Sequence, residues 1–106
     1  MREPTFLILT ALAGQPRHGY GIVQEVETIS GGRARLLTGT LYTALDRLAA
    51  EGLVEPDRDE EIDGRVRHYY RLTAQGLAAL TAETARLRQL SGAAEDRLRA
   101  LRPGIV

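Results

Sequence analysis

The sequence predicts a mainly α-helical domain with one small β-hairpin. Three observations lead to this prediction: apolar residues recur at helical spacing in several segments, glycines and prolines separate those segments, and a stretch in the second half alternates on both sides of an Asp63-Gly64 turn signal. The chain has 106 residues, which is the length of one domain.

The first expected helix begins at Pro4, which suits the first turn because no backbone N–H is needed there. Gly14 and Pro16 end it. Because residues 6–12 are apolar on nearly every side, we expect this helix to be buried on more than one face. We interpret this stretch as a core helix rather than a signal peptide, since no basic leader precedes it.

A second helix is expected from about His18-Gly19 to the Gly31-Gly32 pair. His18 is interpreted as a structural residue at the start of this helix. Residues 33–37 then alternate as in a short strand.

The third helix is expected to have Thr38 as its N-cap and Gly52 just beyond its end. Its buried stripe consists of leucines spaced by four and three residues: Leu41, Leu45 and Leu48. Its outer face carries hydroxyl groups and one guanidinium, with a phenol to one side: Thr40, Thr43, Arg47 and Tyr42.

Residues 53–72 are expected to form the β-hairpin. On the returning strand, one face carries Arg65, Arg67, Tyr69 and Arg71, while Tyr70 and Leu72 on the other face are expected in the core. A two-residue turn would place the apolar face opposite acidic residues, so a longer loop or a bulge is expected.

The last helix is expected to be capped by Thr73 and to end near Arg102, before Pro103-Gly104. Its leucines recur with a heptad-like spacing, which predicts a helix–helix contact. We therefore divide the chain into a winged helix-turn-helix domain at 1–73 and a C-terminal dimerisation helix at 74–106.

Charge is balanced overall but unevenly distributed. All 14 basic residues are arginines, and the formal net charge is zero. Residues 65–71 hold three arginines and no acid, whereas residues 55–63 hold six acids and one arginine. Arginine suits bidentate contacts with phosphate and guanine. A polar-faced third helix followed by an arginine-bearing hairpin therefore predicts a winged helix-turn-helix that binds double-stranded operator DNA.

Three stretches between residues 16 and 76 occur together: PRHGYGI at 16–22, TGTLYTALDRL at 38–48 with EGL at 51–53, and GR with RHYYRLTAQG at 64–76. In these stretches the sequence resembles the PadR family of transcriptional regulators. The resemblance implies a cytoplasmic homodimer, usually a repressor, whose last helix packs against the partner's first helix. Thr43 stands where such proteins often have proline, and Gly21 where many have glutamate. Without tryptophan, stacking of flat aromatic drugs in the manner of some relatives is not available.

The candidate DNA contacts lie in the third helix and the hairpin: Thr38, Gly39, Thr40, Tyr42, Thr43, Arg47, Arg65, Arg67 and Tyr69. Each has an alternative. Tyr42 could pack on the first helix, the two threonines could form a solvated face, and Arg47 could pair with Glu51. The hairpin arginines could pair with acids at 59–61.

The candidate dimer contacts are apolar residues of the first and last helices: Phe6, Leu9, Leu77, Leu80, Leu87, Leu90, Leu98 and Leu101. An effector, where one acts, would bind between the subunits near these helices.

We expect no enzyme, because no nucleophile–base pair or phosphate-cradling loop is visible. We expect no metal, cofactor or membrane span, and the lack of cysteine is compatible with the cytoplasm. The alternative function is a winged helix that binds a protein and not DNA.

Overall fold

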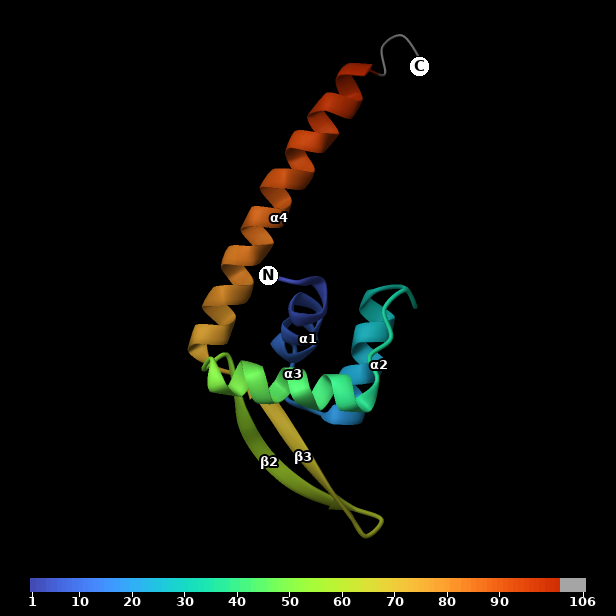
Figure 1. The fold of residues 1–106 in the computed structure, drawn as a ribbon, viewed down its shortest axis with the longest axis vertical. Coiled ribbons are helices and arrows are strands. Elements are labelled where there is room, and N and C mark those ends of the chain that lie inside the picture. Colours follow the sequence, from blue (N-terminus) through green and yellow to red (C-terminus); the bar gives the residue numbers. More distant parts are fainter. Residues whose placement is uncertain (102–106) are drawn as a thin grey trace.

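The computed structural model describes residues 1–101. Figure 1 shows the short helices packed into a body, with the hairpin extending from one side and the last helix from the other. The elements are α1 (Glu3–Ala13), β1 (Arg17–His18), α2 (Gly19–Ile29), α3 (Thr38–Ala50), β2 (Val54–Ile62), β3 (Arg65–Leu72) and α4 (Ala74–Leu101). This order confirms the predicted winged-helix fold class.

The core is centred on α1, as its apolar sequence predicts. Ile8 and Leu9 have no exposed surface, because α2, α4 and β3 all contact α1. The leucine stripe of α3 is buried as well, and Tyr70 and Leu72 pack against this core as expected. Among residues 1–101, no helix has both the length and the hydropathy that a membrane crossing needs.

The sheet has three strands in the order β1-β3-β2, and its shortest strand is not where the sequence predicts one. Residues 33–37 form no strand; Arg17 and His18 form β1 instead and pair with Tyr70 and Tyr69. The alternation at 33–37 has another cause, because Ala34 and Leu36 pack against the core without any strand partner.

Glycines end α2 and α3 as predicted. Gly31 and Gly52 have φ angles of 65° and 78°, a left-handed conformation that glycine adopts without strain. The predicted cap of α3 is wrong by one residue. Leu37 occupies the N-cap position without a side-chain hydrogen bond, and Thr38 is the first helical residue.

The hairpin combines a two-residue turn with a bulge. Asp63 and Gly64 both have positive φ, 50° and 78°, as a type I′ turn requires. The register shifts between Pro56 and Asp59, so two residues of β2 lie opposite Tyr69. Beyond the bulge, Val54 pairs with Leu72. The bulge thus places Tyr70 and Leu72 opposite Pro56 and Val54 rather than opposite acids, whereas Val66 still lies opposite Glu61.

The first turn of α4 is fixed to the junction between α3 and β2. The Thr73 hydroxyl donates to the Gly52 carbonyl at 2.6 Å and accepts from the Gly76 N–H at 2.9 Å, which confirms the predicted cap. A Cβ on Gly76 would overlap the Leu53 carbonyl oxygen. The predicted end of this helix at Pro103-Gly104 lies outside the described residues.

Candidate nucleic-acid interface

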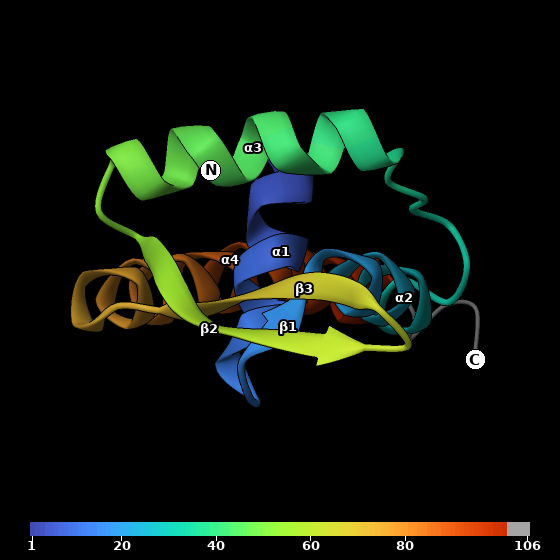
Figure 2. The ribbon, with the colours of Figure 1, turned by 90° about the horizontal axis from the view of Figure 1, so that it is seen from below.

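The helix and hairpin that carry the candidate DNA contacts lie on one side of the molecule. In Figure 2, seen from below, α3 crosses the body next to the β2–β3 hairpin, and the hairpin tip lies toward the amino end of α3. In Figure 1, α4 leaves the body on the opposite side. This side therefore has the arrangement of a recognition helix with its wing.

The first turns of α3 are open to solvent. Thr38, Gly39, Thr40 and Thr43 are all exposed. Three of them line a shallow pocket whose other wall is the start of α1, with Arg2 and Pro4. Arg2 therefore adds a positive charge beside the hydroxyl groups, a contribution that the sequence analysis missed because the two segments are far apart in the chain.

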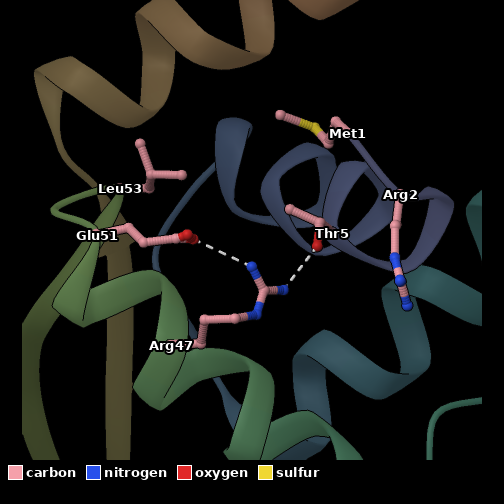
Figure 3. Close-up of a pocket in the computed structure, with 6 residues that line it drawn as sticks. All are labelled: Met1, Arg2, Thr5, Arg47, Glu51 and Leu53. Carbon is pink, nitrogen blue, oxygen red and sulfur yellow. Dashed lines mark hydrogen bonds and ion pairs between the residues drawn. The ribbon is translucent and has the colours of Figure 1, made fainter.

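Arg47 is turned toward α1 rather than away from the protein. Its guanidinium donates to Thr5 Oγ1 at 2.8 Å and pairs with Glu51 at 3.1 Å, as Figure 3 shows. The pairing with Glu51 was the alternative expected from the sequence. Contact of Arg47 with DNA therefore requires these two interactions to be exchanged.

Tyr42 packs on the start of α2. Its side chain is 39% exposed, and a Cβ on Gly19 would lie 2.5 Å from its hydroxyl oxygen. Gly19 is thus required for this packing. The neighbouring Tyr70 is half-buried, and burial raises its pKa above the ordinary value.

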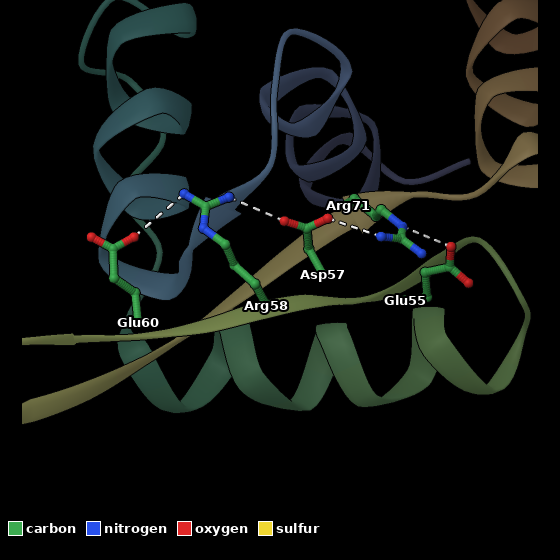
Figure 4. A network of polar contacts seen from close by, with 5 residues as sticks. All are labelled: Glu55, Asp57, Arg58, Glu60 and Arg71. Carbon is green, nitrogen blue, oxygen red and sulfur yellow. Dashed lines mark hydrogen bonds and ion pairs between the residues drawn. The ribbon is translucent and has the colours of Figure 1, made fainter.

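The acids of β2 are largely paired with two arginines. Arg71 bonds to Glu55 at 2.8 Å and Asp57 at 2.9 Å, and Arg58 bonds to Asp57 at 3.1 Å and Glu60 at 3.4 Å (Figure 4). Hydrogen bonds from Arg71 to these carboxylates raise its pKa. Glu55, Asp57 and Glu60 are therefore paired with arginines other than Arg65 and Arg67.

The two hairpin arginines differ in their surroundings. Arg65 is exposed, and within residues 1–101 it forms no ion pair. Arg67 lies against His18, with Nη1 at 3.3 Å from Nε2, and its buried Nε has no hydrogen-bond partner among the described residues. The alternative pairing with acids 59–61 is not observed, because Glu60 bonds to Arg58 and Asp59 bonds to His68.

His18 joins the hairpin to α2. Its Nδ1 accepts a hydrogen bond from the Gly21 N–H at 3.1 Å, which confirms its structural place at the helix start. The Tyr69 ring meets the imidazole edge-on at 5.2 Å between centroids, and Arg58 covers Tyr69 at 4.0 Å. Burial, with the charge of Arg67 in second place, lowers the His18 pKa. Burial and the Arg67 charge thus both favour the neutral form of the imidazole.

The candidate dimer contacts separate into two groups. Leu9 and Leu80 are buried within the subunit, and Phe6 is partly buried against the same core. The remaining five are exposed: Leu77, Leu87, Leu90, Leu98 and Leu101.

Comparison with known proteins places the chain among transcriptional regulators. Residues 8–82 match the model of the Transcriptional regulator PadR-like family. The chain is 39% identical to Transcriptional regulator Rv3488 of Mycobacterium tuberculosis over 84 residues, which is 79% of this chain and 75% of that protein. It is 43% identical over 90 residues, 85% of this chain, to an uncharacterised 37.1 kDa protein in transposon TN4556 of Streptomyces fradiae, but spans only 24% of that protein.

Solved structures share the fold. A PadR family transcription regulator from Clostridium difficile is similar with a TM-score of 0.74 and 25% identity, covering 89% of this chain and 96% of that one. Bacillus subtilis PadR, solved in complex with operator DNA, has a TM-score of 0.69 and 23% identity, covering 78% of this chain and 47% of that one.

Proposed function

We propose, since this chain belongs to the PadR-like family of transcriptional regulators, that it binds operator DNA as a homodimer and represses the genes under that operator. The family is one of regulators, not enzymes. The observation that carries the proposal is the exposed first half of α3 lying beside a wing whose Arg65 forms no ion pair within residues 1–101.

For DNA binding, α3 has the size and face that the major groove admits. Hydroxyl groups and backbone N–H groups commonly contact phosphates and base edges. The proposed direct contacts are therefore Thr38, Gly39, Thr40, Thr43 and Arg65. Tyr42, Arg47, Arg67 and Tyr69 contribute after their present partners are exchanged. The solved complex of the Bacillus subtilis relative with operator DNA supports this proposal.

For dimerisation, the pattern of burial along α4 supports a second copy as partner. Gly76, Leu80 and Glu83 are buried. The steps of four and three residues continue to Leu87 and Leu90, and Leu98 and Leu101 follow on the same helix face after a step of eight. All four leucines are exposed. One helix face thus packs against the body over its first half and is open over its second half. A partner subunit would cover it as in a coiled coil, with residues 1–73 as the DNA-binding unit and residues 74–106 as the dimerisation helix.

A two-fold dimer reads a pseudo-palindrome, with the two α3 helices entering major grooves about one DNA turn apart.

An effector would bind next to the dimer face. A pocket between α1 and α4, lined by Phe6, Leu7, Glu83 and Leu87 among others, is a suitable place. Binding there would change the relative position of the two wings. Such a regulator acts in the cytoplasm, where bacterial DNA lies.

The test is a fluorescence-anisotropy titration of the purified protein against its own upstream DNA and a scrambled control at two salt concentrations. Preference for the upstream DNA with steep salt dependence is expected, because arginines would displace counterions from phosphates. Sedimentation at micromolar concentration should show a dimer. Equal, weak binding to both DNAs, or a monomer, would contradict the proposal.

The network of Figure 4 favours one alternative, a winged helix that binds a protein. Its three carboxylates outnumber its two arginines, and β2 as a whole carries five acids and only one arginine, which gives that strand a net negative charge. A nuclease-resistant complex from lysate, together with no DNA affinity, would support that function instead.

A further inference from the structure

Leu37 occupies an unusual place at the start of α3. Its side chain is 77% exposed, which is the largest fraction among the large apolar side chains of residues 1–101. It also holds the N-cap position, with φ −73° and ψ 147°, where no side-chain hydrogen bond is formed. The preceding Leu36, by contrast, packs against the core.

Neither helix stability nor core packing explains this leucine. An N-cap normally carries Ser, Thr, Asp or Asn, whose oxygen accepts a hydrogen bond from a free backbone N–H of the first turn. Leucine supplies no such oxygen, and at this exposure it contributes little burial. Residues that break a local rule without compensation within the fold are concentrated at functional sites.

The position of Leu37 indicates what could cover it. The residues that follow it, Thr38, Gly39 and Thr40, are small and exposed, so they do not shield its side chain. The amino end of α3 lies on the side toward which the hairpin tip also points (Figure 2). In helix-turn-helix proteins, the amino-terminal residues of the recognition helix contact base edges. The apolar group that the major groove offers there is the C5-methyl of thymine.

We propose that Leu37 packs against the C5-methyl group of a thymine in the operator and thereby specifies an A·T pair at that position. This inference rests on the proposed function, since it requires α3 to enter the major groove. Leu37 is then a specificity-determining residue, distinct from the hydroxyl groups and arginines that position the protein on phosphates.

The test removes the methyl group from the DNA and the apolar group from the protein in turn. A preferred duplex is first selected from a random library with the wild-type protein. Each thymine is then replaced by deoxyuridine, which lacks only the methyl, symmetrically in both half-sites. Loss of one buried methyl should weaken binding about fourfold per half-site, or about 15-fold for both. Threonine methyl groups can cause similar penalties at other positions, so variants are needed to assign each one.

Leu37→Ser should abolish the deoxyuridine penalty at one position and leave the other penalties unchanged. The same variant should raise Tm by about 4 °C, because serine supplies the missing cap. A gain in stability combined with a loss of specificity would not result from damage to the fold. Leu37→Met, which keeps an apolar side chain, should retain the penalty.

Each outcome distinguishes the inference from the function on which it rests. If the wild-type protein selects a duplex but Leu37→Ser keeps every deoxyuridine penalty, or if no thymine shows a penalty, the assignment of Leu37 is wrong while DNA binding stands. If the wild-type protein selects no sequence and binds no duplex above a scrambled control, the proposed function itself fails.

Discussion

The two wing arginines should contribute differently to DNA binding, although the sequence treats them alike. In the proposed dimer, Arg65→Ala removes two exposed guanidinium groups, one from each subunit, and neither forms an ion pair within residues 1–101 of its subunit. Each phosphate contact contributes about 0.9 to the slope of log K against log salt, so the slope should fall by about 1.8. Between about 50 and 200 mM salt, the affinity advantage of the wild-type protein over this variant should therefore shrink about tenfold.

Arg67→Ala should change that slope by less than half as much, because this guanidinium lies against His18 with its Nε buried. Its main effect should be on the imidazole. Burial and the Arg67 charge both lower the His18 pKa, so removing the arginine should raise the pKa toward its ordinary value.

The assay is an anisotropy titration at several salt concentrations, with the His18 pKa followed by NMR. Arg97→Ala serves as the matched control, since it removes an exposed arginine from the last turns of α4. Figure 1 shows that this end of α4 lies far from the wing. Equal slope changes for Arg65→Ala and Arg67→Ala would refute the reasoning, as would an equal change for the control.

Three further predictions concern the scaffold. Gly76→Ala should lower the free energy of unfolding by about 2–3 kcal/mol in urea titrations, because the added carbon overlaps the Leu53 carbonyl. Gly92→Ala is the control: its added carbon has no atom within 4 Å, so the free energy of unfolding should rise by about 1 kcal/mol. Hydrogen bonds from Arg86 hold the Glu83 pKa at about 2, below its ordinary 4.5. The ionised carboxylate therefore stabilises the fold above pH 4.5, and this stabilisation is lost as pH falls toward 2. Glu83→Gln should have a lower free energy of unfolding at neutral pH, and that free energy should fall less steeply in acid. Gly19→Ala places a carbon 2.5 Å from the Tyr42 hydroxyl, so the tyrosine side chain must move. The variant should change the near-UV circular dichroism of tyrosine and weaken operator binding about tenfold. An unchanged spectrum would contradict this packing.

Much of the fold follows from short-range features of the sequence. The Asp63-Gly64 turn, the glycine ends of α2 and α3 and the Thr73 cap are all formed by residues within a few positions of one another. Such features depend on backbone conformation and local hydrogen bonds. They can therefore be predicted from the residues themselves, and the family motifs lie in the same segments.

The partners of the candidate site residues were decided by the tertiary structure. Arg47 bonds to Thr5, 42 residues away, and Arg67 contacts His18, 49 residues away. No periodicity encodes such pairs, since they depend on how α1, α2 and the hairpin are placed in space. The alternation at 33–37 was misleading for the same reason, because burial against a distant core can imitate a strand.

The sequence by itself determined the helices, the hairpin, the family and the segments that carry the candidate interface. Only the tertiary structure decided which of those side chains are free. The bulge in β2 places Glu55 opposite Arg71, and the turn places Arg65 opposite Ile62, outside that network. Packing against the core buries Leu9 and Leu80, two of the candidate dimer contacts. Exposure and pairing arise from distances between segments, and the chain acquires those distances only when it folds.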